Sequence, residues 1–561
     1  MSAEALRVVL CWHMHQPEYR DPSSGEYQAP WTYLHAIKDY VDMAVHLETA
    51  PAGVKAVVNF PPVLLDQIAD YADRIHAHLH DGSDIGDPLL DALSAPGMPT
   101  ASGIRRSLLE RCLQAHEHHM IARFPQYQHL VMMTREALEA GPGPDYLSDR
   151  HLEDLLTWYH LAWLGETVHR RDGRVKALVE RGQGYGREER QALVAIIGEL
   201  MAGLLDRYRT LATSGRVELS VSPRFHAMLP LLLDFDCARE AEPDLRLPAI
   251  ERYPGGEARA AWQLTQARVC AREHLGLEPA GCWPSEGGVS AAALELIGKH
   301  GFAWAASGQA VLRNSLGDGE PDSNVLHRPY RLAPDGPVCF FRDDELSDRI
   351  GFVYKDWHGD DAVADFVSRL ESLAAEGEPG RVVAVILDGE NPWEHYPHNG
   401  IHFVPALYAA LAQNHALQLC TFSECVDDAS VSVAALPGLV AGSWVYGTLS
   451  TWIGDPDKNR AWELLCQAKA ACDGILPSID EPERRTAIEY QLGVCEGSDW
   501  FWWFGDYNPS EAVTEFDSLY RLQLNALYGM LGEPPPEDLL REISRGHGHP
   551  ELGGTMRRGR R

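Results

Sequence analysis

Two acidic residues occupy positions from which a carboxylate could do chemistry. Glu286 follows a Trp-Pro-Ser segment and precedes two glycines, a turn that lets other backbone approach closely. Asp388 follows the six apolar residues Val382–Leu387, so we expect it at the end of a buried strand. A pair of carboxylates beside a sugar-binding surface is the minimum equipment for glycoside hydrolysis, in which one attacks or activates water and the other donates a proton. For Asp388 taken alone, a helix N-cap is the simpler interpretation.

Further polar clusters directly follow other apolar segments. They are His13-Met14-His15-Gln16-Pro17, Asn59, Ser222 with His226, and Arg342-Asp343-Asp344. Each cluster taken alone is typical of an ordinary polar loop. The catalytic groups of a β/α barrel come from the C-terminal ends of its strands. If these segments are barrel strands, their clusters converge on one face.

The fifteen tryptophans are unevenly placed. Trp12, Trp283 and Trp393 each lie beside one of the polar clusters, and six of the fifteen lie from Trp444 onward. Three of those six fall within the four residues 500–503, and on a helix they cannot all face one core direction. We interpret them as a sugar-stacking wall, with a packed domain interface as the alternative.

The elements that would position these residues alternate along the chain. Short β-branched segments, several of them continuously apolar, are separated by helix-like stretches, which predicts parallel β/α units with strands buried on both faces. The strand candidates are Val8–Trp12, Val54–Phe60, Val217–Val221, Ala280–Trp283, Phe302–Ala306, Val338–Phe341, Val382–Leu387 and Leu417–Thr421.

Helical segments fill the rest of the chain. The gap between the second and third strand candidates is too long for one crossover, and Ile104–Phe124 and Glu189–Leu211 predict a helical insertion at about 70–210. We therefore expect an α/β fold with a catalytic β/α barrel over 1–430. A helical domain over 431–532 would contribute to the active site, with helices at 458–472, 481–492 and 509–531. Residues 533–561 would form a short helix and a basic tail.

Charge and composition restrict the partners. With 49 Lys+Arg against 81 Asp+Glu, the net charge of −32 argues against a nucleic-acid partner and against an anionic membrane surface. A neutral sugar polymer is not penalised. Eleven cysteines without a CxxC pair predict reduced thiols, and we expect a cytoplasmic protein with no signal peptide and no membrane span.

Five segments, taken in order, carry a family resemblance. They are His13-Met14-His15-Gln16-Pro17, Gly215-Arg216-Val217-Glu218, Trp283-Pro284-Ser285-Glu286, Asp388-Gly389-Glu390-Asn391 and Ser498-Asp499-Trp500-Phe501-Trp502-Trp503. In order and spacing they resemble the conserved regions of glycoside hydrolase family 57. One position departs from the pattern, because many relatives have Ala or Pro where Ser285 precedes Glu286. The forms DGENPWE and GSDWFWW resemble the amylopullulanase and α-amylase branch more than the glucanotransferases and branching enzymes.

The resemblance implies a fold and a reaction. It implies an incomplete (β/α)7 TIM-like barrel followed by a helical domain, so that one of the eight strand candidates would be wrong or would lie outside the barrel. It also implies retaining hydrolysis of starch- or glycogen-type α-glucans at α-1,4 bonds, with Glu286 as nucleophile and Asp388 as general acid/base. Cleavage of α-1,6 bonds and transglycosylation, as in a 4-α-glucanotransferase or a branching enzyme, stay open. We expect no cofactor and no metal ion.

The resemblance also implies substrate-binding residues. Four residues in matching positions would hold the sugar at the point of cleavage: His13, Glu218, Glu390 and Asp499. Three tryptophans would stack on neighbouring glucose units: Trp283, Trp393 and Trp502. Three further candidates lie in the matching motifs: His15, Gln16 and His226.

Two alternatives come from other functional classes. His13 and His15 are two residues apart, so on a strand both would face one way, and an added Asp could complete the metal site of a deacetylase on a related barrel. The rest of such a ligand set is not apparent in the sequence. The other alternative is a non-catalytic glucan-binding protein, and the presence of both Glu286 and Asp388 argues against it.

Overall fold

The centre of the molecule is a closed barrel of seven parallel strands. The computed structural model describes residues 5–140, 143–317 and 322–548. Around the barrel the strand order is β1-β2-β3-β4-β5-β7-β8, and β8 closes it by pairing with both β7 and β1. The strands are β1 (Leu6–His13), β2 (Ala56–Phe60), β3 (Val217–Val221), β4 (Gly281–Cys282), β5 (Trp304–Gly308), β7 (Val338–Arg342) and β8 (Val382–Asp388). The predicted seven-stranded barrel is confirmed.

The eighth strand candidate lies outside this barrel. It corresponds to β9 (Leu417–Leu419), which pairs with Leu6–Val8 of β1. On that edge of β1, strand β2 pairs only from Cys11 onward, so the first half of the edge is open to β9. Two strands of two residues each are additional to the prediction: β6 (Tyr330–Arg331), antiparallel to β7, and β10 (Ala434–Ala435), parallel to β6.

The barrel strands are apolar because both of their faces are buried. Alternate residues of β1 belong to two separate packing clusters, with Val9 and Cys11 in the smaller one together with Trp304 and Ile386. The intervening Val8 and Leu10 pack instead in the large cluster shared with the surrounding helices. This two-sided burial explains the continuous apolar segments seen in the sequence.

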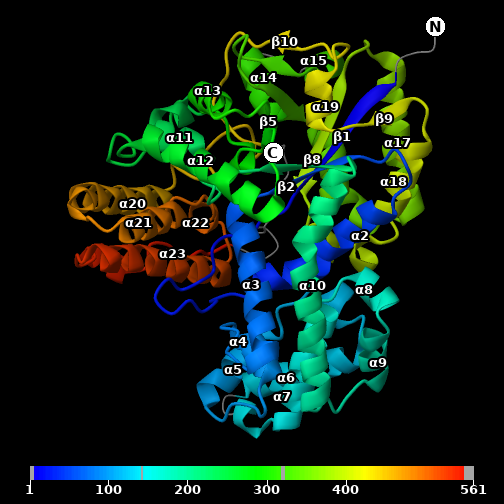
Figure 1. Ribbon diagram of the computed structural model, residues 1–561, viewed down its shortest axis with the longest axis vertical. Coiled ribbons are helices and arrows are strands. Elements are labelled where there is room, and N and C mark those ends of the chain that lie inside the picture. The colour runs from blue at the N-terminus through cyan, green and yellow to red at the C-terminus, as the bar shows by residue number, and fades with distance from the viewer. Residues whose placement is uncertain (1–4, 141–142, 318–321, 549–561) are drawn as a thin grey trace.

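A helical insertion separates β2 from β3, as the sequence predicts. Two long helices, α3 (Pro62–Asp81) and α10 (Arg187–Thr213), run side by side away from the barrel and carry the smaller helices at their far end (Figure 1). Those smaller helices are α4 (Pro88–Ser94), α5 (Ser102–Arg111), α6 (Pro125–Glu139), α7 (Asp149–Ala162), α8 (Glu166–Arg171) and α9 (Gly173–Arg181). The segment Ile104–Phe124, predicted to be part of this insertion, is divided in two, because α5 ends at Arg111 and a separate π-helical turn covers Glu117–Ile121. The Tyr127 hydroxyl binds the carbonyl of Cys112 at this break (2.6 Å).

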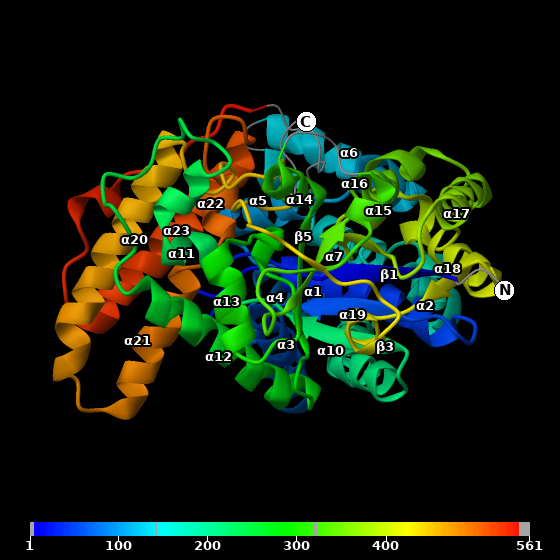
Figure 2. The same cartoon turned by 90° about the horizontal axis from the view of Figure 1, so that it is seen from above.

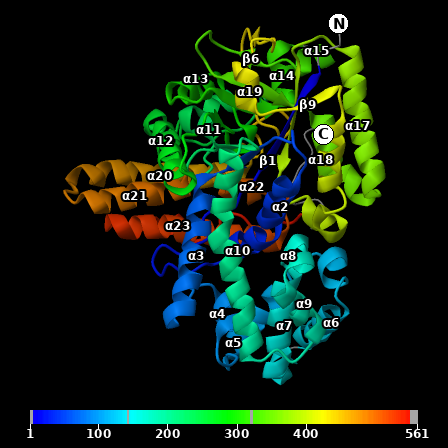
Figure 3. The same cartoon turned by 45° about the vertical axis from the view of Figure 1, so that its right-hand side comes forward.

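The helices after the barrel form a layer along its side. Helices α20 (Pro456–Ile475), α21 (Pro482–Cys495) and α23 (Ser510–Leu531) lie together, with the short α22 (Asp499–Trp503) between them and the barrel (Figures 2 and 3). A 3-10 turn, Glu537–Leu540, follows, and the predicted basic tail lies outside the described residues.

The remaining helices connect the strands. They are α1 (Trp31–His35), the π-helix η1 (Ala36–Tyr40), α2 (Val41–Thr49), α11 (Leu229–Leu233), α12 (Gly256–Leu275), α13 (Ala291–Lys299), α14 (Gln309–Leu316), α15 (Ser323–Leu326), α16 (Asp344–Asp348), α17 (Gly359–Glu376), α18 (Val404–Gln413) and α19 (Phe422–Asp427). Within the described ranges, no helix combines the length and the apolar composition needed to cross a bilayer. All eleven cysteines are described, and each is buried and outside any disulfide.

Candidate active site

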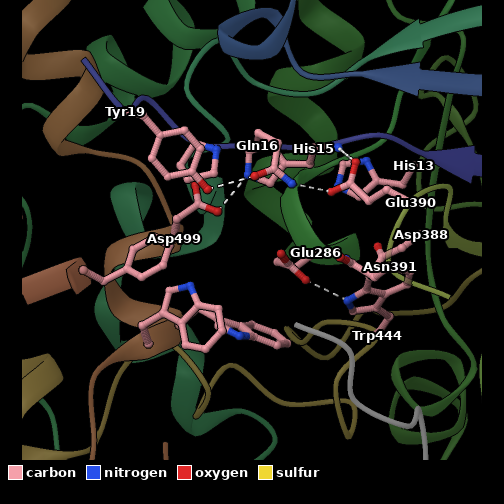
Figure 4. Close-up of a pocket in the computed structure, with 14 residues that line it drawn as sticks. His13, His15, Gln16, Tyr19, Glu286, Asp388, Glu390, Asn391, Trp444 and Asp499 are labelled. Carbon is pink, nitrogen blue, oxygen red and sulfur yellow. Dashed lines mark hydrogen bonds and ion pairs between the residues drawn. The ribbon is translucent and has the colours of Figure 1, made fainter. Parts of the chain in front are cut away.

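A pocket opens where the C-terminal ends of the barrel strands meet the C-terminal helices. It encloses about 570 Å³, and Figure 4 shows its lining. The lining residues come from the end of β1, the loops after β4 and β8, the segment before α20, and helices α22 and α23: His13, His15, Gln16, Pro17, Tyr19, Glu286, Asp388, Glu390, Asn391, Trp444, Asp499, Trp502, Trp503 and Phe516. The structure thus brings eight of the twelve predicted site residues to one pocket, including both predicted catalytic carboxylates.

Glu286 lies in a tight 3-10 turn just after β4. Its backbone has a left-handed φ of 57° and the following Gly287 a φ of 60°. A non-glycine residue held in this region is uncommon and is found most often at functional sites. The indole Nε1 of Trp444 donates to Oε2 of Glu286 (2.9 Å), and the backbone N of Trp444 donates to the carbonyl of Glu286 (3.1 Å). Trp444 therefore fixes both the turn and its carboxylate.

Asp388 is the last residue of β8, where the strand leaves the core. Its register partner is His13, the last residue of β1, so the two side chains share one level of the barrel mouth. Asn391 donates from Nδ2 to Oδ2 of Asp388 (3.0 Å). Burial raises the pKa of Asp388 to about 6, with the Asn391 bond opposing the rise. A carboxyl group with this pKa can hold a proton near neutral pH.

Glu390 is buried and held by three donors. Gln16 donates from Nε2 (2.8 Å), the backbone N of His15 donates at 3.2 Å, and the Tyr40 hydroxyl also donates to this carboxylate. Burial raises the pKa of Glu390 well above its usual value, and the nearby Asp388 adds to the rise. Tyr40 closes the π-helix η1 and is absent from the sequence prediction.

Three histidines stack beside the carboxylates. The rings of His15 and His226 lie 3.8 Å apart between centroids, and that of His13 lies 5.2 Å from His226. Burial, aided by the neighbouring histidines, lowers the pKa of His13 to about 3 and that of His226 well below its usual value. Both rings are therefore neutral at neutral pH.

Each of these three histidine rings has one nitrogen bonded to the protein and one nitrogen without a protein partner. His13 Nδ1 binds Asn59 (2.7 Å), His15 Nε2 binds Asp499 (2.8 Å) and His226 Nδ1 binds Ser498 (3.0 Å). Among the described residues, the opposite nitrogens, His13 Nε2, His15 Nδ1 and His226 Nε2, are buried without a protein partner. Buried polar atoms normally have partners, so the two that belong to pocket-lining residues, His13 Nε2 and His15 Nδ1, are suited to hydroxyl groups of a bound ligand.

Aromatic rings form the wall of the pocket opposite the histidines. Trp502, Trp503 and Phe516 line it, and Trp503 stacks on Phe516 with centroids 5.0 Å apart. Trp500, the third tryptophan of the cluster, is buried and packs on Tyr520 instead. The cluster therefore serves both interpretations made from the sequence: Trp502 and Trp503 face the pocket, and Trp500 belongs to the domain interface.

The position of Glu218 disagrees with a role in holding the sugar. It is the second residue of β3 and pairs with Val57. The β3 residue level with His13 is Ser220, so Glu218 lies two residues, or about 7 Å, below the barrel mouth. Its carboxylate accepts from Nε1 of Trp304 (2.7 Å) and from the backbone N of Ser423 (3.0 Å). The pairing of β3 with β2 sets the level of Glu218 in the barrel, below the mouth. The order of the motifs along the chain does not reveal this level.

Two predicted stacking tryptophans are also outside the pocket lining. Trp283 is fully buried inside the barrel, with its ring 5.1 Å from that of Trp444. Trp393 is 1% exposed, donates from Nε1 to the carbonyl of Gly389 (2.9 Å) and packs on Trp12. Neither presents a free ring face to a sugar, because each follows a strand so closely that its ring packs into the core. His226 lies behind His15 and does not line the pocket.

The possible metal ligands in this site do not converge well. One ligand atom each from His15, His226 and Asp499 can be chosen so that all lie within 4.8 Å. However, the His15 and His226 rings are stacked with only 29° between their planes. The in-plane lone pairs of two such rings run almost side by side, whereas a zinc ion needs them to meet at about 2 Å from each nitrogen. This geometry does not favour the metal-dependent deacetylase alternative.

Comparisons with known proteins agree on one family. The sequence model of glycosyl hydrolase family 57 matches residues 9–435, and no curated protein sequence matches the chain. A branching enzyme from Thermococcus kodakaraensis shares the fold at 15% identity, with a TM-score of 0.57 over 96% of this chain and 94% of that one. So does an α-amylase from Thermotoga maritima, at 12% identity and a TM-score of 0.56 over 96% of each chain.

A third solved structure has the same fold within a longer chain. It is a 4-α-glucanotransferase from Thermococcus litoralis, at 14% identity and a TM-score of 0.53, covering 94% of this chain and 60% of that one. The structural likeness extends through the helices after the barrel, and the family model covers more than half of the sequence. The chain belongs to glycosyl hydrolase family 57.

Proposed function

We propose that this protein is a retaining α-glucan-active glycosidase that cleaves α-1,4 bonds, with Glu286 as nucleophile and Asp388 as general acid/base. The observation that carries the proposal is the common pocket of these two carboxyl groups, one of them with a pKa raised to about 6. Retaining glycosidases need such a pair, one group ionised and the other protonated when substrate binds.

The first step forms a bond between Glu286 and the sugar. The ionised carboxylate attacks the anomeric carbon while protonated Asp388 gives its proton to the glycosidic oxygen, and the bond between that oxygen and the anomeric carbon breaks. Asp388 then takes a proton from incoming water, whose oxygen displaces Glu286 and releases a sugar of the original configuration. The Trp444 N–H bonded to Glu286 stabilises its charged form before attack.

The rest of the pocket suits a glucose ring. The unpartnered nitrogens of His13 and His15 are available to sugar hydroxyls, and Trp502 offers an apolar surface to a sugar face. Glu390 and Asp499 supply carboxylates beside them. A ligand so held is neutral, polar and ring-shaped. The solved structures of similar fold include an amylase and a branching enzyme, which supports an α-glucan substrate.

A transferase is the second candidate function, because it shares the covalent intermediate. If a sugar hydroxyl reaches the intermediate before water, the product is a transferred chain. The aromatic wall of Trp502, Trp503 and Phe516 favours this outcome, since it could hold an acceptor sugar close to Glu286. Branching enzymes and a 4-α-glucanotransferase are among the structures of similar fold. Assignment to the amylopullulanase branch, cleavage of α-1,6 bonds and a cytoplasmic location stay predictions.

Product analysis tests this proposal. Purified protein is incubated with maltooligosaccharides, glycogen and pullulan, with the Glu286→Gln variant as control. Short products identify an amylase, maltotriose from pullulan identifies α-1,6 cleavage, and products longer than the substrate identify a transferase. Unchanged substrates with the wild type, or equal products with Glu286→Gln, would refute the proposal.

A further inference from the structure

A second concave site lies outside the active site. Four aromatic residues line it, Tyr354, Trp357, Tyr396 and Phe403, and the concavity measures about 500 Å³. Trp357 is 42% exposed, whereas the other three are buried and form the floor. An exposed tryptophan over an aromatic floor is unusual for a surface whose only task is solubility.

The floor of this aromatic pocket is rigid. The Tyr354 hydroxyl donates to Asp365 (2.7 Å), and the Tyr396 hydroxyl donates to the carbonyl of Ile350 (2.6 Å). A Cβ on Gly359 would lie 2.7 Å from the carbonyl oxygen of His402, so glycine allows the loop after Trp357 to lie directly against the loop before α18. Trp357 is thereby presented on a fixed support.

The lining indicates the chemistry of a ligand. None of the described residues that line the pocket is an Asp, Glu, Lys or Arg. The polar groups at the rim are His358, whose side chain is 75% exposed, and the exposed His402. Aromatic faces with hydrogen-bonding groups at their edge, and a lining whose described residues include no Asp, Glu, Lys or Arg, suit an uncharged ligand that has both apolar faces and hydroxyls. A sugar chain has this chemistry.

The aromatic pocket and the active site lie at the same end of the barrel. The segments that form the pocket follow β7 and β8, and the active-site residue Asp388 is the last residue of β8. A run of ring contacts also joins the two sites. From Trp12, the neighbour of His13, it passes to Trp393 (5.7 Å between centroids) and then to Tyr396 (5.5 Å).

The run then continues into the pocket itself. Tyr396 contacts Phe403 (5.5 Å), Phe403 contacts Tyr354 (5.9 Å) and Tyr354 contacts the exposed Trp357 (5.4 Å). Trp393, which the sequence suggests as a sugar platform, is one of the buried members of this run. The exposed platform at its end is Trp357.

We propose that the aromatic pocket is a second α-glucan-binding site, which holds a part of a polymeric substrate away from the point of cleavage. The identity of the sugar rests on the proposed function. Trp357 stacks on a glucose ring, and His358 and His402 bind hydroxyls at its edge. The site raises affinity for long chains such as glycogen, because two contacts on one polymer reinforce each other, and it leaves short oligosaccharides unaffected.

Binding to glycogen without turnover tests the site. The full-length Glu286→Gln protein is run by affinity electrophoresis in gels containing glycogen, with and without Trp357→Ala. Loss of one stacking ring should weaken retention about three- to tenfold. The matched control is Tyr146→Ala, which removes an aromatic ring that is 86% exposed and belongs to neither pocket. In the active enzyme, Trp357→Ala should raise KM for glycogen by the same factor and leave KM for maltotetraose unchanged.

The outcomes separate this proposal from the proposed function. Unchanged glycogen retention in Trp357→Ala, or no retention of the parent protein, overturns the second site even if the enzyme cleaves α-glucans. If retention of the Glu286→Gln protein depends on Trp357 but the wild type cleaves no α-glucan, the second site is supported and the proposed function is refuted. A change of sedimentation from dimer to monomer on Trp357→Ala would show that a second copy occupies the pocket, and would overturn the proposal.

Discussion

The two ends of the barrel use carboxylates in opposite ways. At the mouth, Asp388 ends its strand and lines a pocket with Glu286. At the lower end, Glu218 lies near the start of its strand and accepts bonds from Trp304 and Ser423. Two residues along a strand amount to about 7 Å, which separates a group that can meet a ligand from one that holds the fold together. Position along the strand therefore matters more than membership of a motif.

Tryptophans show the same contrast. Trp283 and Trp393 immediately follow strand ends or their loops and are buried, whereas Trp444 and Trp502 come from segments after the barrel and line the pocket. Rings next to a strand end are drawn into the adjoining core. The walls of the pocket are instead supplied by the part of the chain that packs over the barrel mouth.

The largest expected difference between substitutions at the two ends of the barrel is in kcat. Glu286→Gln removes the attacking group, so kcat on maltooligosaccharides should fall about a thousandfold or more. Glu218→Gln, the matched change at the lower end, should leave kcat within about threefold. Steady-state kinetics of the two purified variants, with circular dichroism to check folding, measures both. Similar losses in the two variants would contradict the distinction.

The next difference concerns stability, and Asp388→Asn should increase it. The folded pKa of Asp388 is about 6 against an ordinary value of 3.8. Between these values the folded protein holds a proton that the unfolded chain has released, so wild-type stability falls as pH rises from about 4 to 6. Asparagine has no such dependence. At pH 7 the variant should be more stable by about 1–3 kcal/mol.

Urea unfolding at several pH values checks this prediction. The difference in the free energy of unfolding between Asp388→Asn and wild type should vanish below about pH 4, where Asp388 is protonated in both the folded and the unfolded wild type. Asp360→Asn, which changes a carboxylate that is 82% exposed, is the control and should show no such difference. If the wild type is as stable as Asp388→Asn at pH 7, burial does not destabilise the ionised form of Asp388.

At the lower end of the barrel, replacing the carboxylate should lower the stability of the protein. Glu218→Gln replaces one acceptor oxygen by an amide that faces the donors of Trp304 and Ser423. We expect a loss of about 1–3 kcal/mol in the free energy of unfolding. Thermal unfolding of the variant against the wild type measures this loss. Unchanged stability would mean that Glu218 does not hold the lower end together.

The smallest expected effect concerns the indole bonded to Glu286. Trp444→Phe keeps most of the ring but removes the N–H that donates to the carboxylate. Without this donor the attacking carboxylate is held less firmly, so kcat on maltooligosaccharides should fall about three- to tenfold. Steady-state kinetics of the purified variant measures this fall. An unchanged kcat would show that Trp444 only shapes the pocket.

Much of the barrel could be predicted from the sequence because its strands are continuously apolar. All eight strand candidates correspond to strands. The resemblance implied that one was either wrong or outside the barrel, and the structure shows that β9 lies outside it. Asp388 could be located because a charge after six apolar residues marks a strand end. The end of α5 at Arg111, within the helical segment 104–124, could not be located, since no proline or glycine marks it.

The site itself could be predicted only in part. Its motif residues are recognisable, but motifs carry no register, so the sequence could not show that Glu218 lies outside the pocket lining. Trp444 lies in a segment without helix or strand periodicity, and its contact with Glu286 spans 158 residues. Tyr40 reaches Glu390 from a π-helix whose sequence resembles any amphipathic helix. Long-range contacts of this kind leave no local signal.

Trapping the covalent intermediate tests the central claim most directly. The protein is treated with 5-fluoro-α-glucosyl fluoride, which slows release of the sugar from a retaining enzyme, and is then digested and analysed by mass spectrometry. We predict one fluoroglucosyl group, attached to the peptide that contains Glu286, and no adduct with Glu286→Gln. An adduct on another carboxylate, or turnover of α-glucans with inverted products and no adduct, would contradict the account.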